Sequence, residues 1–327
     1  MDVTPFLEPK IAPRAVFDSL PERRSRARFF VPDGDDWRVV TWGAFARQIR
    51  RAAVFLSSLG LRPGDRAAIY APNSVAWISA ALGTQAAGGA LVPVYPASTS
   101  EQAAYVIAHS DARVLFVATA ALLGRVFEAW ESCAQLERIV LLDDSLDVAA
   151  VLAGARKQGK KVPPYAAVER RLVSWSQAQA IGAAIDAEDE RAFERRMSEV
   201  SLEQPGMMLY TSGTSGNPKG VPLSHRNVAT NGADWLRCNG PLLEVGAVDL
   251  LWLPMSHIFG FGEACLGNTL GFTSYLTDPV SVLGKLPEVR PSVFMSVPSL
   301  WEKLALSGMH EPDLAKQQAA LRAVTGG

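Results

Sequence analysis

Residues 41–59 place apolar side chains at helical spacing. The stretch reads TWGAFARQIRRAAVFLSSL, and its apolar positions recur every three or four residues. This pattern predicts an amphipathic helix with one buried face. Thr41 can cap the first turn, and Gly60 can end the helix in the left-handed conformation.

From residue 66 to residue 143, short apolar runs alternate with helical patterns. RAAIYAP, GALVPVYP, ARVLFVA and RIVLLD read as strands. Between them lie predicted helices, one capped by Ser74 and one opening with Ser98 and Glu101 at capping-box spacing. The strands are apolar on both faces, which favours a mostly parallel sheet covered by helices on both sides.

Residues 150–200 are more polar and rich in Ala, Glu and Arg, which indicates a helical connection. Beyond it we expect further elements: a helix over 224–237, a strand over 249–255, a helix over 259–270 and a strand over 292–298. The fold class is therefore predicted as α/β, with two doubly wound, mostly parallel sheet lobes packed with helices. The first lobe with its connection would span 1–200, and the second 201–327.

No charged residue occurs from Ala67 to Ser100, so hydropathy alone could indicate a membrane span. Pro72, Gly83 and Pro93 interrupt the stretch, together with other polar and glycine positions. It is better interpreted as a strand, a turn, a buried helix and a second strand.

The composition is that of an ordinary globular protein. The 327 residues are 48% hydrophobic and carry a formal net charge of −1, which provides no electrostatic footprint for nucleic acid. Three cysteines stand far apart, which is typical of a reducing compartment. The N-terminal residues show no basic segment followed by an apolar run, so we expect no signal peptide and a cytoplasmic location.

The most distinctive stretch is LYTSGTSGNPKGVPLSHRN, residues 209–227. Glycines let the backbone approach a ligand closely and turn through positive φ, and successive amides can form an anion-binding nest. Hydroxyls add hydrogen-bond donors, and Lys219 adds a positive charge. The stretch is therefore predicted to bind phosphate through Thr211, Ser212, Gly213, Thr214, Ser215, Gly216 and Lys219.

This loop is not a Walker A loop, because Pro218 stands where that pattern requires glycine before the lysine. Pro222 also argues against a helix directly after the loop. We expect a loop between two extended segments. The ordered Thr-Ser-Gly-Thr-Ser-Gly-x-Pro-Lys-Gly string disfavours the alternative of an ordinary surface loop.

YTSGTSGNPKGVPLSHRN resembles the phosphate loop of the adenylate-forming superfamily, which comprises acyl-CoA synthetases, luciferases and nonribosomal adenylation domains. Ser215 stands where the family usually has a second Thr. LRPGDRAAIYAPNSVAWISAALGTQAAGGALVPVYP resembles the family's first lobe. LWLPMSHIFGFGEACLGNTLGF resembles its acyl-site helix, and VRPSVFMSVPSLWEKL the segment that follows.

Within this superfamily, the acyl-site string is most similar to long-chain fatty acyl-CoA synthetases. Amino-acid-activating domains place an Asp beside an aromatic residue here, whereas this chain has no carboxylate until Glu263. The resemblance implies an apolar acyl tunnel near His257, Phe259, Phe261 and Gly262. Some bacterial relatives have a gating Trp near position 261, where this chain has Phe.

The reaction that the resemblance implies has two steps and uses ATP, Mg²⁺ and coenzyme A. A fatty acid carboxylate attacks the α-phosphorus of ATP, and the thiol of coenzyme A then displaces AMP. Lys219 and His257 are the expected catalytic residues, and Thr211 is expected to contact the Mg²⁺. Fatty acid and ATP are the expected partners. Oligomeric state and peripheral membrane contact stay open.

The chain ends in LRAVTGG, which resembles the start of a family segment that packs against adenine, so Gly326 and Gly327 are expected there. The family's β-barrel and C-terminal domain have no counterpart in these 327 residues. We therefore expect an N-terminal fragment, inactive alone, of a long-chain fatty acyl-CoA synthetase. Two alternatives are an acyl-AMP ligase that serves a carrier protein and a non-catalytic nucleotide- or acyl-binding module.

Overall fold

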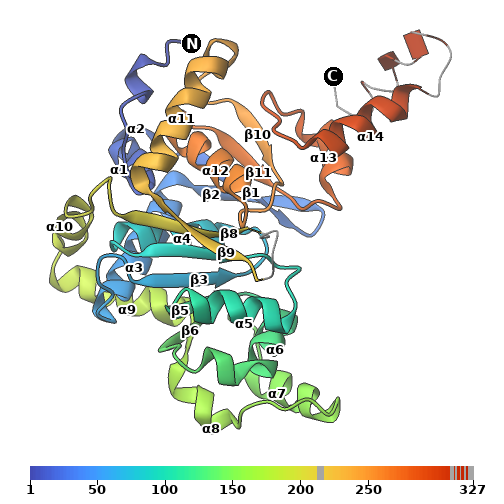
Figure 1. Cartoon of the computed structure of the whole chain (residues 1–327). Coiled ribbons are helices and arrows are strands. Elements are labelled where there is room, and N and C mark those ends of the chain that lie inside the picture. The colour runs from blue at the N-terminus through green and yellow to red at the C-terminus, as the bar shows by residue number, and fades with distance from the viewer. Residues whose placement is uncertain (212–216, 310–312, 314, 317, 320–321, 323–327) are drawn as a thin grey trace.

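The computed structural model describes residues 1–211, 217–309, 313, 315–316, 318–319 and 322. Its larger sheet has the strand order β7-β6-β5-β3-β4-β8-β9, parallel throughout except for β9 (Figure 1). The strands are β3 (Arg66–Tyr70), β4 (Ala90–Val94), β5 (Ala112–Val117), β6 (Arg138–Leu141), β7 (Leu172–Ser174), β8 (Pro205–Thr211) and β9 (Lys219–Ser224).

The smaller sheet has the order β10-β11-β1-β2, in which only β2 runs antiparallel to its neighbour. Its strands are β1 (Ala27–Asp33), β2 (Asp36–Thr41), β10 (Val248–Leu251) and β11 (Thr273–Leu276). The predicted class, two mostly parallel sheets packed with helices, is confirmed. Each sheet takes strands from both sides of residue 200, so sheet membership does not follow the predicted lobe boundary.

Alternate strand residues of the larger sheet enter different cores. Ala67 and Ile69 of β3 pack into one buried cluster, and Ala68 and Tyr70 into another. This two-residue period is the pleat of a strand with helices on both faces. One cluster includes α3 (Trp42–Ser58) and α4 (Val75–Ala86), and the other includes α5 (Ser100–His109), α6 (Ala120–Glu128) and α7 (Val148–Lys157).

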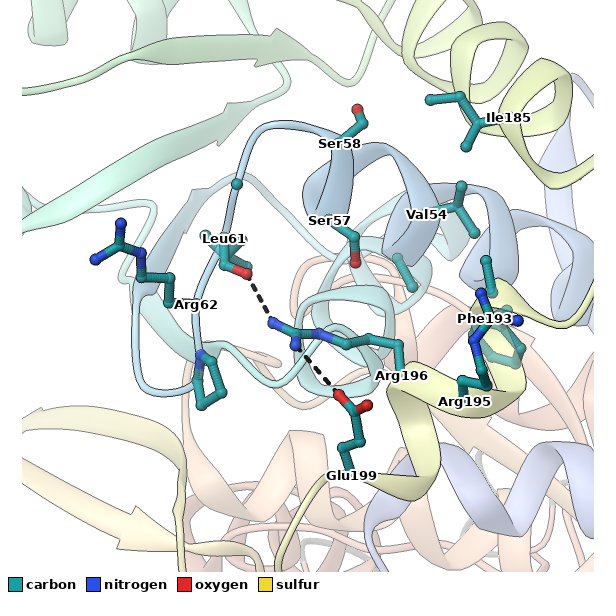
Figure 2. A pocket seen from close by; sticks show the side chains of 14 residues that line it. Val54, Ser57, Ser58, Leu61, Arg62, Ile185, Phe193, Arg195, Arg196 and Glu199 are labelled. Carbon is teal, nitrogen blue, oxygen red and sulfur yellow. Dashed lines mark hydrogen bonds and ion pairs between the residues drawn. The ribbon is translucent and has the colours of Figure 1, made fainter. Parts of the chain in front are cut away.

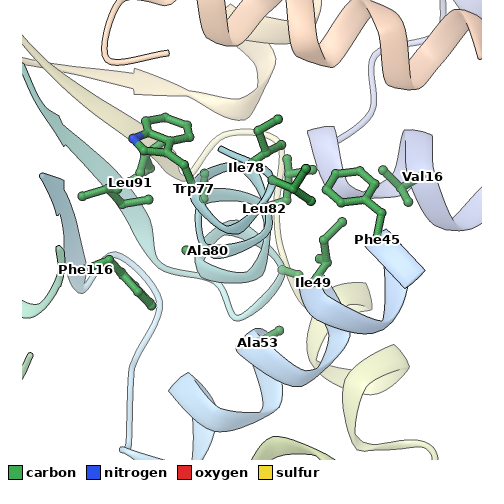
Figure 3. Packing of buried hydrophobic residues seen from close by; sticks show 14 of the residues in the cluster. Val16, Phe45, Ile49, Ala53, Trp77, Ile78, Ala80, Leu82, Leu91 and Phe116 are labelled. Carbon is green, nitrogen blue, oxygen red and sulfur yellow. The ribbon is translucent and has the colours of Figure 1, made fainter. Parts of the chain in front are cut away.

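Helix α4 explains the long uncharged stretch. Every residue of this helix except Ala76 is buried, as expected for a helix that is apolar all round (Figure 3). Ser74 caps α4 by accepting the Trp77 N–H at 3.0 Å. No helix in the described part of the chain is long and apolar enough to cross a membrane.

The remaining α-helices cover the sheets or connect them. Helices α9 and α3 pack side by side, and α11 and α12 lie near the smaller sheet (Figure 1). These elements are α1 (Ala12–Asp18), α2 (Leu20–Arg23), α8 (Tyr165–Val168), α9 (Trp175–Glu188), α10 (Ala192–Ser198), α11 (His225–Asn239), α12 (Ile258–Leu270), α13 (Val282–Val289) and α14 (Pro298–Met309).

Two local expectations were wrong. The capping box of α5 uses Thr99 and Gln102, one residue later than predicted, because Ser98 still belongs to the turn before the helix. The stretch 292–298 is not a strand. It makes a single bridge between Val293 and Asp249, and α14 already begins at Pro298.

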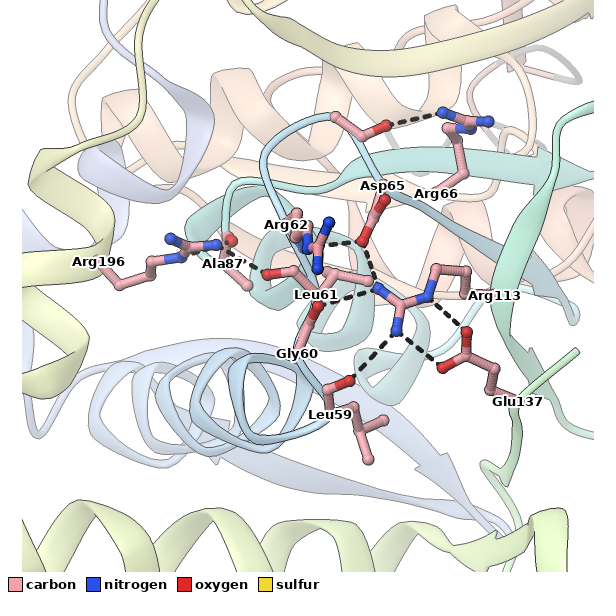
Figure 4. Close-up of polar contacts among 11 residues, drawn as sticks. Leu59, Gly60, Leu61, Arg62, Asp65, Arg66, Ala87, Arg113, Glu137 and Arg196 are labelled. Carbon is pink, nitrogen blue, oxygen red and sulfur yellow. Dashed lines mark hydrogen bonds and ion pairs between the residues drawn. The ribbon is translucent and has the colours of Figure 1, made fainter.

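The turn between α3 and β3 is held by polar contacts around Arg113 (Figure 4). Its guanidinium donates to both carboxylate oxygens of Glu137, at 2.7 and 2.8 Å, and to the Gly60 carbonyl at 3.0 Å. It also pairs with Asp65. These contacts raise the pKa of Arg113, with the Glu137 hydrogen bond the largest cause. The network fixes the start of β3, a central strand of the larger sheet.

Candidate functional site

The predicted phosphate loop connects β8 to β9. Thr211 and Lys219 are cross-strand partners at the loop end of this hairpin, and both are exposed. The extended segments expected on both sides of the loop are therefore present. Ser212, Gly213, Thr214, Ser215 and Gly216 lie outside the described residues, as do Gly326 and Gly327.

Helix α11 begins immediately after the hairpin. Ser224 and Asn227 form a capping box: the Ser224 hydroxyl accepts the Asn227 N–H at 3.1 Å. The sequence placed this helix start correctly. His225, the first helical residue, packs its ring over Gly206 of β8, where an added Cβ would lie 2.5 Å from the imidazole. Helix and hairpin are thus in close contact at the end of the hairpin away from the loop.

Near the loop, the hairpin is anchored to α5. The Tyr210 hydroxyl and His109 Nδ1 are 2.8 Å apart, and Tyr105 packs against both rings. Burial raises the pKa of Tyr210 to about 12, so its hydroxyl stays protonated. Sequence reasoning gave His109 no role, because no local pattern shows that α5 faces β8.

His257 is the N-cap residue of α12. Its Nδ1 accepts the Phe259 N–H at 3.2 Å, and its side chain is exposed. The preceding segment is tied to the larger sheet by Asn73, which donates to the Leu253 carbonyl at 2.8 Å and accepts from the Met255 N–H at 2.9 Å. These two bonds fix where α12 starts. Asn73 is a positioning residue that sequence reasoning missed.

A cavity of about 610 Å³ lies between α1, α11, α12 and the N-terminal residues. Phe259 and Gly262 of α12 line it, whereas His257 and Phe261 are absent from its walls. Phe261 is fully buried in the core, with its ring centroid 6.0 Å from that of Trp77. The helical period separates these residues, because positions three and four apart share a face and 261 points away from it.

Four buried polar side chains also line this cavity: Arg23 of α2, Gln85 of α4, His225 of α11 and Glu263 of α12. Burial lowers the pKa of His225 from 6.5 to about 4, so its imidazole is neutral at pH 7. Within the described part of the chain, no group of three or more His, Cys, Asp or Glu side chains is placed to hold a metal ion.

A second cavity, of about 510 Å³, lies between α3, α9 and α10 (Figure 2). Its Arg196 donates to the Leu61 carbonyl at 2.8 Å and lies 3.4 Å from Glu199. Arg195 pairs with Asp189. Arg195 and Arg196 are therefore occupied by protein groups, and Arg62 is the third arginine of the lining.

The comparisons with known proteins decide the family. The model of the AMP-binding enzyme family matches residues 17–327. The chain belongs to this family.

Its relatives among curated proteins share this AMP-binding region. The long-chain-fatty-acid–CoA ligase ACSBG2 of Mus musculus is 29% identical over 285 residues, covering 83% of this chain and 39% of that protein. The long-chain-fatty-acid–CoA ligase FadD15 of Mycobacterium tuberculosis is 30% identical over 272 residues, covering 82% of this chain and 40% of that protein. The AMP-binding chain thus spans about 40% of the length of these curated relatives.

Solved structures agree on the fold of this AMP-binding chain. The A-PCP didomain of carboxylic acid reductase from Segniliparus rugosus, in complex with AMP, has a TM-score of 0.74 at 16% identity, covering 97% of this chain and 48% of that one. The structure of a putative long-chain-fatty-acid CoA ligase from Rhodopseudomonas palustris has a TM-score of 0.66 at 17% identity. It covers 91% of this chain and 66% of that one.

Proposed function

We propose that this chain binds ATP at the β8–β9 hairpin and a long-chain fatty acid in the cavity between α11 and α12. It would thereby provide the adenylate-forming part of a fatty acid–CoA ligase. The observation that carries the proposal is the cavity itself: it is large, it is lined by Phe259 and Gly262, and it borders α11, the helix that follows the hairpin. The names of the curated relatives support the same substrate class.

In the proposed reaction, a carboxylate oxygen attacks the α-phosphorus of ATP and the bond to pyrophosphate breaks. Lys219, exposed beside the loop, would hold phosphate oxygens by charge-assisted hydrogen bonds. Thr211 would offer its hydroxyl beside them. A bound Mg²⁺ would neutralise phosphate charge, and Thr211 is the described residue that we propose near it.

His257 is proposed to orient the attacking carboxylate. Its exposed ring at the N-terminus of α12 supports this role, because the helix end favours negative charge. Transfer of the acyl group from AMP to coenzyme A would follow. That second step is proposed for the longer ligases that this chain resembles, and the names of the relatives support it.

Replacing Lys219 with alanine should weaken MgATP binding by about tenfold or more, because a charge-assisted hydrogen bond contributes about 1.5–3 kcal/mol. Isothermal titration calorimetry on the chain would measure this effect. Lys303→Ala on α14 is the matched control, since it removes an exposed lysine remote from the hairpin. Equal MgATP affinities in wild type and Lys219→Ala would exclude the role given to Lys219.

A tryptophan at position 262 should shorten the fatty acids that the chain binds. A Cβ at Gly262 would meet no atom within 4 Å, so the new side chain can enter the cavity without a backbone collision. We expect long-chain binding to be lost and short-chain binding to persist. Gly284→Trp on exposed α13 is the control, because a Cβ there also meets open space. Unchanged chain-length preference in Gly262→Trp would place the acid elsewhere.

A further inference from the structure

Three polar side chains of the α11–α12 cavity carry atoms that have no hydrogen-bond partner. Gln85 Oε1, His225 Nε2 and both carboxyl oxygens of Glu263 have none among the described residues. These residues are only 1%, 3% and 1% exposed. Native proteins leave very few buried polar atoms unpaired, and each exception calls for an explanation. Here three exceptions line one cavity.

The three groups lie on different elements but share surroundings. Gln85 Nε2 donates to the Gly206 carbonyl at 3.0 Å, and the His225 ring packs over the same glycine. Glu263 lies on α12, on the face that carries Phe259 and Gly262. The cavity therefore brings together side chains from α4, α11 and α12 that the sequence separates widely.

The charge state of the group follows from its burial. Desolvation, and then the nearby Asp249, raise the pKa of Glu263 well above its ordinary value, which favours the protonated, neutral carboxyl. The buried Arg28 does not neutralise it, because its guanidinium donates to Asn268, Ser274 and two carbonyls. His225 is neutral as well. The group thus carries no net charge.

These groups offer both a donor and acceptors. In its protonated form, Glu263 donates through its hydroxyl and accepts through its carbonyl oxygen, and the unpaired Gln85 Oε1 accepts as well. A hydroxyl is the smallest neutral group that both donates and accepts. A methylene chain would leave all of these atoms unpaired, and a ketone would satisfy only the donors.

We propose that Gln85, His225 and Glu263 form a binding site for a hydroxyl group carried on the chain of the substrate acid. The inference rests on the proposed function, because it treats the cavity as the acyl site. It makes hydroxylated long-chain carboxylic acids the preferred substrate class. Glu263 follows His257 by six residues, or about 9 Å along α12. The hydroxyl would therefore lie within the chain and away from the reacting carboxylate.

The test is calorimetric binding of hexadecanoic acid and of its hydroxylated isomers, with the hydroxyl moved along the chain. Wild type should bind one mid-chain isomer about tenfold more tightly than the plain acid, the effect of one or two well-formed hydrogen bonds. Glu263→Gln, which keeps a neutral donor and acceptor, should retain this preference. Glu263→Met should abolish the preference for the hydroxylated acid and should bind the plain acid at least as tightly as wild type does.

Glu302→Met is the matched control, because Glu302 is an exposed carboxylate of α14 outside the cavity lining. It should keep the wild-type preference. Thermal unfolding checks that each variant folds. If Glu263→Met does not fold, binding of the isomer series to the wild-type chain still tests the inference. Binding of plain and hydroxylated acids with equal affinity would overturn this inference and leave the proposed function intact. Tighter binding of an amino-substituted acid would also overturn it, by indicating an ion pair. Binding of no acid at all would instead reject the proposed function.

Discussion

Replacing Gly260 with alanine is expected to lower the free energy of unfolding by about 3 kcal/mol, the upper range for overpacking a core. A Cβ at this position of α12 would lie 2.6 Å from the Leu253 carbonyl oxygen and closer still to that of Pro254. Both obstacles are backbone atoms, so no side-chain rotation relieves the collision. Urea unfolding of the purified chain would measure the change.

Gly262→Ala is the matched control on the same helix, because its Cβ would meet nothing within 4 Å. Alanine is the better helix former, so this variant should be slightly more stable than wild type. The contrast matters for function, since Gly260 lets α12 approach the segment that Asn73 holds and that ends in His257. Equal stability of the two variants would show that this close approach is not required.

The second large effect is the pH dependence that His225 produces. Its folded-state pKa, about 4, is below the ordinary value of 6.5. Between pH 4 and pH 6.5, His225 is protonated in the unfolded chain but not in the folded chain. Its contribution to the free energy of unfolding is therefore fully present above pH 6.5 and is lost as the pH drops toward 4. The full effect is about 3 kcal/mol, at 1.36 kcal/mol per pKa unit.

The measurement is the free energy of unfolding from pH 7 to pH 4 for wild type and His225→Gln. Asp249 and Glu263 act in the opposite direction, because their raised pKa values make stability fall as the pH rises above their ordinary values. Their contributions cancel when the two curves are subtracted. The free energy of unfolding of wild type minus that of the variant should fall by about 3 kcal/mol between pH 7 and pH 4. A difference independent of pH would show that His225 titrates normally when folded.

Local signals in the sequence predicted most elements of this fold. The helical period of 41–59 corresponds to α3, and Ser74 and Ser224 cap the helices expected to follow them. The uncharged stretch after Ala67 becomes a strand, a buried helix and a second strand, as its glycines and prolines indicated. These features depend only on residues that are close in the sequence, so they can be predicted from one sequence.

Long-range pairing was not predictable in the same way. Nothing local shows that β1 and β2 join the sheet of β10 and β11, or that β8 and β9 extend the sheet of β3 and β4. The candidate site shows the same limit. Motif resemblance indicated Phe259 and Gly262, which line the cavity, but also Phe261, which the turn of α12 directs into the core. Gln85 and His225 reach the cavity only through tertiary packing.

The most direct test of the central claim is to map where a long-chain fatty acid binds. A photoreactive fatty acid, with a diazirine on its chain, would be crosslinked to the chain and the labelled peptides identified by mass spectrometry. We expect labels in α11 and α12, on the residues that line the cavity between them, and competition by unlabelled acid. If the labelling that unlabelled acid suppresses were confined to the second cavity, between α3, α9 and α10, that result would contradict the account.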